Sequence, residues 1–470
     1  MASNNALNRE AFYAARKSLA HHATGGNVLI LATLLALIVA NIPGLGSLYN
    51  DFWNQEMRLQ IGDFNIFSHA GHPMTVLQFI NDALMAIFFF NIGLEIKREI
   101  LVGELSSFRQ ALLPIMGAIG GMLVPVGLYF VFAAGTDYID GAAIPMATDI
   151  AFSLGVIAML GSRVPLSLKI FLTTLAVVDD IGGIIVIALF YSSHIDVAFL
   201  GYAAIGLGIL FTGGALLKIQ SKMFYFIIGG VVWFLVLNSG IHPTIAGVLV
   251  ALCVPAVPVY APKKYIREIK DNIRKFSDDE EEDLSRRSIL SHEQMDWLKR
   301  IESASDRVIS PLQDMEDQIH PLSSYLIIPL FAFANAGIYL LDFNPATVIS
   351  GISIAIIVGL IAGKFLGIFI FSWLTVKLGL APMPEKADWK MMAAISMLGG
   401  IGFTVSLFIA GLTFGDGSPK SAQLLSDAKL GIVIGSFISG LCGYLLLKAF
   451  LPKTDCVEKQ STSHESCSRG

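Results

Sequence analysis

Two adjacent aspartates, Asp179 and Asp180, lie in the middle of an apolar run from Ile170 to Phe190. The run is long enough to cross a bilayer as a helix. A carboxylate near the bilayer centre costs about 3 kcal/mol on insertion scales, so ionisable groups at that depth usually belong to a substrate or ion pathway. We therefore predict that this pair of carboxylates binds a cation and protons alternately.

Three more ionisable side chains lie within apolar runs: Asp82, Asp149 and Lys364. A buried ammonium group is tolerated where a carboxylate neutralises it. Neighbouring helical residues point about 100° apart, so Asp179 and Asp180 cannot share one task symmetrically. We expect one of them to pair with Lys364 and the other to face a water-filled cavity. The alternative is a purely structural ion pair, but one lysine cannot neutralise four acids, and the surplus favours cation binding.

The composition is that of a membrane protein. Of the 470 residues, 54% are hydrophobic and only 15% are charged, whereas soluble proteins have about 25% charged residues. The mean hydropathy is +0.67. The four cysteines form no C-x-x-C or His/Cys motif of a structural metal site, and a disulfide framework is not expected. No cleavable signal peptide is recognisable, and neither a cofactor nor a nucleic-acid partner is indicated.

Twelve apolar runs predict an all-α protein that crosses the bilayer twelve times. They lie at about 27–45, 73–93, 111–133, 142–160, 168–191, 197–217, 223–238, 242–260, 322–341, 346–375, 391–413 and 430–451. Lysine and arginine are concentrated on one side, which places both termini in the cytoplasm. The predicted organisation is an N-terminal cytoplasmic segment (1–26), helices one to eight (27–260), a cytoplasmic insertion (261–320), helices nine to twelve (321–452) and a disordered cytoplasmic tail (453–470).

Two runs carry signs of an interrupted helix. The fourth contains Pro145 before the polar pair Thr148 and Asp149, and the eleventh contains a glycine-rich stretch at 399–402. An interruption exposes one helix end with partial positive charge and another with partial negative charge. We expect Asp149 to offset the positive ends and Lys364 the negative ends. Interrupted helices at corresponding places in two halves are typical of transporter binding sites.

Two polar segments have patterns of their own. In the first outer loop, at about 47–70, Met57, Leu59 and Ile61 alternate with polar residues before a turn at 62–63, which predicts a small extracytoplasmic β-hairpin. A hairpin alone is marginally stable, so it would pair with a partner subunit or pack on its own helices. The insertion contains an acidic block at 277–283 and is interpreted as a solvated, partly helical linker.

These motifs resemble those of the NhaA family of bacterial sodium/proton antiporters. The matching stretches cover most of the membrane portion in the family's order: Asn81–Phe89, Gly93–Glu99, Ala143–Phe152, Gly161–Pro165, Val178–Gly182, Pro329–Gly337, Gly363–Gly367 and Gly400–Thr404. The resemblance implies electrogenic, pH-regulated exchange of cytoplasmic Na⁺ or Li⁺ for external H⁺ in a bacterial inner membrane, without a cofactor. It also implies inverted repeats formed by spans three to five and ten to twelve, and a homodimer formed through the outer hairpin.

The same resemblance implies roles for single residues. Asp180 would be the principal ion-binding carboxylate, and Asp179 would pair with Lys364 and release it as the ion binds. Thr148 and Asp149 would lie at the crossing of the interrupted helices, and Asp82 in the outward funnel. The cytoplasmic funnel and pH response are implied for Glu95, Lys97, Arg98, Glu99 and Glu316. Gln313 and Asp317 depart from the family's basic residue and histidine, and the insertion is longer than the family's usual connection.

Two other functions remain open at this stage. An intramembrane aspartyl protease would use Asp149 with Asp179 or Asp180, but it would not explain Lys364, and the chain lacks the Gly-x-Gly-Asp pattern of such proteases. A sodium-coupled symporter of an organic solute would use a similar buried site. Peptide cleavage would identify the first, and solute-dependent sodium uptake without proton movement would identify the second.

Overall fold

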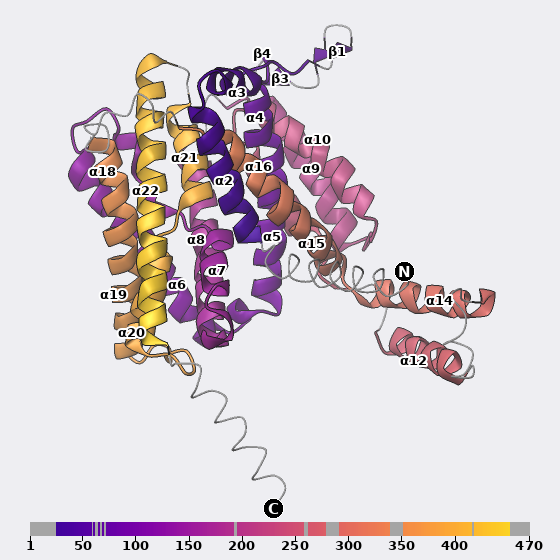
Figure 1. Ribbon diagram of the computed structural model, residues 1–470. Coiled ribbons are helices and arrows are strands. Elements are labelled where there is room, and N and C mark those ends of the chain that lie inside the picture. Colours follow the sequence, from indigo (N-terminus) through magenta and orange to yellow (C-terminus); the bar gives the residue numbers. More distant parts are fainter. Residues whose placement is uncertain are drawn as a thin grey trace, which may run out of the picture. The chain divides into compact units, whose positions relative to one another are not determined.

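The computed structural model describes residues 25–58, 60–61, 64–65, 68–69, 72–191, 195–257, 262–278, 291–338, 351–415 and 418–451. The described chain is mostly helical and forms two compact units, and Figure 1 labels most of its helices. The first contains the described residues of Met1–Met85, Glu99–Ser193 and Ser323–Gly470, and the second those of Ala86–Arg98 and His194–Leu322. Nearly all of the predicted N-terminal segment (1–26), the whole predicted tail (453–470) and most of the acidic block lie outside the described residues.

The first unit holds most of the apolar helices, with η marking short 3₁₀ or π turns. Its elements are α2 (Gly25–Asn41), α3 (Leu45–Trp53), α4 (Val76–Phe79), η1 (Ile80–Leu84), η2 (Glu104–Ser106), α6 (Phe108–Ala133), η3 (Ile139–Met146), α7 (Ile150–Ala158), η4 (Gly161–Arg163), α8 (Leu166–Phe190), η5 (Ser323–Ile327), α16 (Ile328–Asn335), α18 (Gly351–Val358), η6 (Gly359–Gly363), α19 (Lys364–Lys377), α20 (Trp389–Leu398), α21 (Phe403–Phe414) and α22 (Pro419–Phe450). Helices suit this composition because they pair their backbone polar groups internally.

The second unit packs helices around an apolar core of its own. It contains most of α5 (Met85–Leu101), with α9 (Val197–Ala215), α10 (Lys222–Asn238), α11 (Thr244–Cys253), α12 (Pro262–Asp278), α14 (His292–Val308) and α15 (Pro311–Leu322). Buried side chains from five of these helices meet in the core, among them Leu94, Leu210, Val232, Ala251 and Met315. The predicted partly helical insertion thus contains the paired helices α12 and α14, while α15 joins the core.

Seven helical segments among the described residues are long and apolar enough to cross a membrane: Val76–Leu101, Phe108–Ala133, Ile139–Ala158, Leu166–Phe190, Val197–Ala215, Gly351–Lys377 and Pro419–Phe450. The count rises to nine if each bent pair is one span, α2 with α3 at 116° and α20 with α21 at 41°. Helices α10 and α11 are apolar but shorter. The chain is therefore a multi-pass membrane protein, whereas the number twelve remains a prediction.

The outer loop differs from the hairpin expected over 47–70. Its first part is helix α3, in which Tyr49 and Trp53 are buried four residues apart, on one helical face. Two antiparallel ladders of two residues per strand follow: β1 (Gln60–Ile61) pairs with β2 (Phe64–Asn65), and β3 (Ser68–His69) pairs with β4 (His72–Pro73). The predicted turn at 62–63 lies outside the described residues.

Three predicted boundaries were wrong for local reasons. Helix α22 begins at Pro419 and not near 430, because Ser418 caps it and proline suits the first helical turn. Helix α11 ends at Cys253 and not near 260, shortly before Pro255. Helix α5 continues past 93 to Leu101, so the charged cluster at 95–99 is helical.

Candidate ion-binding site

The fourth predicted span is interrupted, as the sequence predicts. A 3₁₀ stretch, η3, ends at Met146, and helix α7 begins only at Ile150. Asp149 has an extended backbone and caps α7, because its carboxylate accepts a hydrogen bond of 2.9 Å from the Phe152 amide. An acidic cap satisfies a free amide and complements the positive helix end.

The eleventh predicted span is interrupted between Leu398 of α20 and Phe403 of α21. The same Asp149 carboxylate reaches this second break, where it accepts hydrogen bonds from the Thr404 amide at 3.0 Å and the Thr404 hydroxyl at 2.6 Å. The Asp149 amide donates to the Ile401 carbonyl at 2.6 Å. One buried carboxylate therefore contacts the positive ends of two helices, as expected of a residue that offsets them, and the functional role of Asp149 remains a prediction.

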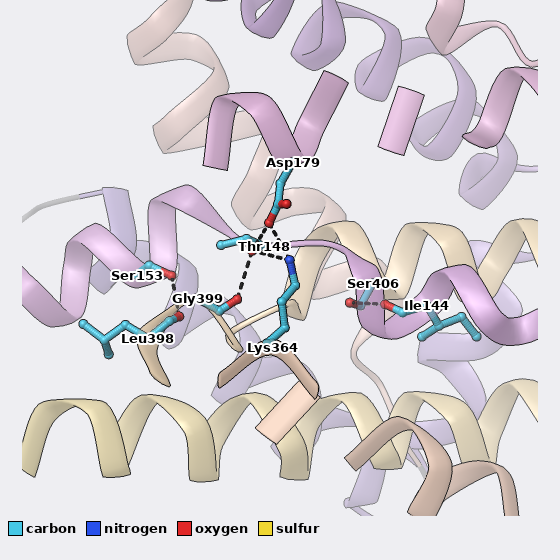
Figure 2. Close-up of polar contacts among 8 residues, drawn as sticks. All are labelled: Ile144, Thr148, Ser153, Asp179, Lys364, Leu398, Gly399 and Ser406. Atoms are coloured by element: carbon cyan, nitrogen blue, oxygen red, sulfur yellow. Dashed lines mark hydrogen bonds and ion pairs between the residues drawn. The ribbon is translucent and has the colours of Figure 1, made fainter. Parts of the chain in front are cut away.

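At the negative ends of the interrupted helices, free carbonyl groups accept hydrogen bonds from hydroxyl side chains (Figure 2). Ser406 donates to the Ile144 carbonyl at 2.7 Å, and Ser153 donates to the Leu398 carbonyl at 3.3 Å. Thr148 lies 2.9 Å from the Gly399 carbonyl. Lys364 was expected in this role, but its Nζ contacts Thr148 and Asp179 instead. Direct contact with these carbonyls is thus made by hydroxyl side chains, and an electrostatic role of Lys364 at the negative ends remains a prediction.

Lys364 and Asp179 form a fully buried ion pair, drawn in Figure 2. The Lys364 ammonium also donates to the Thr148 hydroxyl at 2.9 Å, and that hydroxyl lies 2.6 Å from Asp179 Oδ2. Because a hydroxyl has one proton, Thr148 donates either to Asp179 or to the Gly399 carbonyl. The predicted pairing of one aspartate with Lys364 is present in the structure, and Asp179 is the partner.

The second oxygen of Asp179 is exceptional. Asp179 Oδ1 is buried and has no hydrogen-bond partner among the described residues. Buried carboxylate oxygens are normally paired, since an unpaired buried polar group is costly. This oxygen is therefore available as a ligand for a small cation or as the acceptor of a proton.

Close backbone contacts allow Lys364 to reach this position. A Cβ added at Gly121 of α6 would lie 2.9 Å from Ile368 and 3.6 Å from Lys364 Nζ, and one added at Gly363 would lie 2.7 Å from the Cα of Pro125. Glycine permits such close helix packing in membrane proteins. The π turn η6 ends at Gly363, immediately before Lys364. Such turns are frequent at functional sites.

Asp180 and Asp82 are also buried in the first unit, with exposed fractions of 4% and 9%. Asp82 lies in a second π turn, η1, next to Asn81, whose side chain accepts a hydrogen bond of 2.8 Å from Asn335 of α16. The water-filled cavity expected beside Asp180 remains a prediction. Within the described ranges, no three His, Cys, Asp or Glu side chains gather as a metal-binding group.

Two of the residues predicted for the pH response contact each other, and two others contact backbone groups. Arg98 forms an ion pair of 2.6 Å with Glu316 of α15. Lys97 donates to the carbonyls of Leu252 and Val254, at 2.7 and 2.5 Å, and so caps the end of α11. Glu99 accepts a hydrogen bond from the Glu104 amide at 3.1 Å, and Glu95 is half-buried on α5. The Arg98–Glu316 pair joins two residues that the sequence identified separately.

Several residues that complete the crossing were missed from the sequence. Thr404 lies in the first turn of α21, and Ser406 and Ser153 each reach across to the other interrupted span. Ser439 of α22 donates to the Met397 carbonyl at 2.6 Å. The available signal was a serine or threonine within the first turn after each interruption, because short hydroxyl side chains commonly satisfy free helix-end groups.

Comparison with known proteins identifies related chains. A family described as "Na+/H+ antiporter 1" matches residues 16–447. A Na(+)/H(+) antiporter NhaA of Phocaeicola vulgatus is 53% identical over 93% of this chain and 96% of its own length. Proteins of the same name from Bacteroides fragilis and Rhodopirellula baltica are 51% and 42% identical, over 92% of this chain and 96% and 92% of their own lengths.

Proposed function

We propose how the buried aspartates work in this chain, which belongs to the Na+/H+ antiporter 1 family and is a sodium/proton antiporter, not an enzyme. Family membership sets aside both the intramembrane protease and the organic-solute symporter. The observation that carries the proposal is the buried group of Lys364, Thr148 and Asp179 at the crossing of two interrupted helices, next in sequence to a second buried acid, Asp180.

In this proposal Asp180 is the principal ligand of the transported sodium ion. Sodium is a hard cation and prefers oxygen ligands, as calcium and magnesium do. Asp179 contributes its unpaired Oδ1. A sodium ion next to Asp179 weakens the hold of that carboxylate on Lys364, because the two cations then share one negative charge. When the Lys364 ammonium leaves Asp179, it can still donate a hydrogen bond to the neutral hydroxyl of Thr148.

Exchange follows from competition for the same oxygens. A carboxylate that carries a proton has lost the negative charge that attracts sodium, so bound protons and bound sodium exclude each other. The coupling is reciprocal, since each ligand lowers the affinity of the other by the same factor. Alternate opening of the site to the two sides then gives antiport. Thr148 supports the change by donating its single proton to Asp179 or to Gly399.

Asp149 and Asp82 have supporting roles. Asp149 neutralises the two positive helix ends at the crossing, and its three acceptor contacts hold the interruptions in place. We assign Asp82 to the outward path of the ions, since it is a buried acid on an unusual turn.

The membrane arrangement proposed is twelve spans in a bacterial inner membrane with both termini in the cytoplasm. The shorter apolar helices α10 and α11 and the helix containing α16 would supply the spans beyond the nine found. Spans three to five and ten to twelve would form inverted repeats. In support, each set consists of a long helix, an interrupted helix and another long helix. The loop at 47–70 would form the homodimer contact.

The transport cycle proposed is electrogenic and exports cytoplasmic Na⁺ or Li⁺ in exchange for external protons. Its pH response involves Glu95, Lys97, Arg98, Glu99 and Glu316. The Arg98–Glu316 ion pair supports this assignment, because it links α5 to α15 and a change in either charge would alter that link.

Proton flux in everted membrane vesicles tests the proposal. Sodium added across a pH series is expected to release the preformed pH gradient, and Asp180→Asn is expected to abolish this response while the protein remains in the membrane. The matched control is Asp137→Asn, which removes an acid from the exposed pair with Lys420 and is expected to leave exchange intact. Normal sodium-dependent flux in Asp180→Asn would contradict the assignment of the ion-binding residue.

A further inference from the structure

Helices α12 and α14 pack against each other (Figure 1). None of the residues assigned above to ion exchange lies in their polar sequences. Tyr265 and Asn272 of α12 and Ala304 of α14 are buried, and they mark the faces through which the two helices pack. Ile266 and Ile273 of α12 are instead 43% and 52% exposed. Two isoleucines this exposed on such a polar helix call for an explanation.

The exposed isoleucines lie beside basic side chains. At about 100° per residue, Ile273 returns to the stripe of Ile266, and Lys270 and Arg274 lie about 40° and 80° further around the axis. All four side chains are exposed. Lys264 and Lys275 are on the opposite side of α12, about 160–180° from Ile266. The helix thus combines an exposed apolar stripe with a basic flank, the pattern of helices that lie in the interface of a membrane.

The hairpin of α12 and α14 is held close to the apolar core of the second unit. Eight residues separate Cys253 of α11 from Pro262 of α12, and two separate Val308 of α14 from Pro311 of α15. Val254 and Leu312, at the two attachment points, are both part of the core. An extended chain covers at most about 3.6 Å per residue, so the nine steps from Cys253 to Pro262 span no more than about 32 Å.

The charge of α12 indicates whether its exposed isoleucines face a lipid surface or a second copy of the chain. Helix α12 has six basic residues and three acidic ones, whereas α14 has three basic and four acidic. A basic surface with two exposed isoleucines complements an anionic lipid surface, where each Lys or Arg contributes about 1 kcal/mol. A second copy of the same basic face would repel it.

We propose that the α12–α14 hairpin docks on the anionic headgroups of the bilayer that the chain spans. Ile266 and Ile273 enter the interface, and Lys270 and Arg274 contact the lipid phosphates. This docking goes beyond ion exchange and does not depend on it.

Fluorescence in nanodiscs tests the docking on the full chain. An environment-sensitive probe is attached at Ile273→Cys in a background whose four native cysteines are replaced by serine. Its emission is expected to shift to shorter wavelength in discs with phosphatidylglycerol relative to phosphatidylcholine alone. A probe at Ser303→Cys, on the side of α14 that lines a cavity with Glu268, serves as the reference and is expected to stay in water. Symmetric discs make the result independent of the orientation of the chain.

Charge reversals separate the basic flank from the opposite side. Lys270→Glu with Arg274→Glu is expected to abolish the shift, since the ratio of docked to undocked hairpin falls roughly fivefold for each basic side chain removed. Lys264→Glu with Lys275→Glu makes the same change in net charge and is expected to retain it. Sodium/proton exchange in proteoliposomes confirms that each variant is folded.

Three results would overturn the docking: equal emission in both lipids, equal loss in both double reversals, or a shift that occurs only when two copies share a disc. The last would identify a second copy of the chain as the occupant. Since transport is measured on the same variants in proteoliposomes, failure of the docking is distinguishable from failure of the proposed exchange site.

Discussion

The chain contains two ion pairs of similar composition in very different surroundings. Lys364 and Asp179 are fully buried at the crossing of two interrupted helices, whereas the side chains of Arg98 and Glu316 are 35% and 9% exposed. A buried ion has no water to bind when its partner leaves, so another charged group must take the place of that partner. A partly exposed ion can exchange its partner for water. This difference supports the proposed exchange of Lys364 for a transported cation at the buried pair, and the proposed pH response at the partly exposed pair.

The largest effect is expected from breaking the buried pair. Lys364→Met keeps the side-chain volume but leaves Asp179 uncompensated, which is expected to lower the free energy of unfolding by about 3–5 kcal/mol. Thermal unfolding in detergent measures the loss. Lowering the pH is expected to restore part of the stability, because a protonated Asp179 is neutral and the folded protein then binds a proton that the unfolded chain gives up.

The double variant Lys364→Met with Asp179→Asn is the control for this explanation. It removes both charges and is expected to recover most of the lost stability without restoring exchange. If it were no more stable than Lys364→Met, the loss would come from packing and not from an uncompensated charge.

The next effect in size concerns the caps at the crossing. Asp149→Ala leaves the amides of Phe152 and Thr404 without their acceptor, at a cost of about 1–2 kcal/mol for each helix N-terminus. Asp149→Asn retains one acceptor oxygen and is expected to lose about half as much. Equal stability of Asp149→Ala and the parent protein would show that the crossing does not depend on this carboxylate.

A smaller effect is expected at the hydroxyl that links the crossing to the ion pair. Thr148→Val preserves the shape but removes the contacts to Lys364, Asp179 and Gly399, at a cost of about 1–3 kcal/mol. Sodium-dependent exchange is expected to fall in Thr148→Val and to persist in Thr148→Ser. Loss in both variants would point to the methyl group and to packing.

The smallest change in stability is expected at the partly exposed pair. Arg98→Gln is expected to cost about 1 kcal/mol or less, but to move the pH at which exchange is half-maximal. The exposed pair of Lys420 and Asp137 provides the control, since Lys420→Gln is expected to leave both stability and pH profile unchanged. An identical pH profile in Arg98→Gln would separate this pair from the pH response.

The sequence was most informative where a residue type is costly in a membrane. Asp149, Asp179 and Lys364 were identifiable because charge inside an apolar run needs a partner, and the structure provides those partners. The interruptions of the fourth and eleventh spans were likewise predictable from Pro145 and the glycines near 400. The proximity of these segments depends on tertiary packing, which no local pattern encodes.

The sequence was least informative where ordinary residues complete the site. Ser406, Ser153 and Ser439 cap helix ends far away in the sequence, and a serine in an apolar run carries little energetic signal. Helix α3 was missed because the alternation that follows it favoured a hairpin for the whole loop. The contact of Arg98 with Glu316 joins residues more than two hundred positions apart, and only the fold brings them together.

Proton release on sodium binding tests the central claim most directly. The purified protein is placed in weakly buffered detergent with a pH indicator, sodium is added, and sodium binding is measured in parallel by calorimetry. Competition at Asp179 and Asp180 predicts that protons are released in proportion to the sodium bound. It also predicts that the apparent affinity for sodium falls about tenfold for each unit by which the pH is lowered, for each proton that sodium displaces. Asp180→Asn is expected to lose both signals. Sodium binding without proton release would contradict the account.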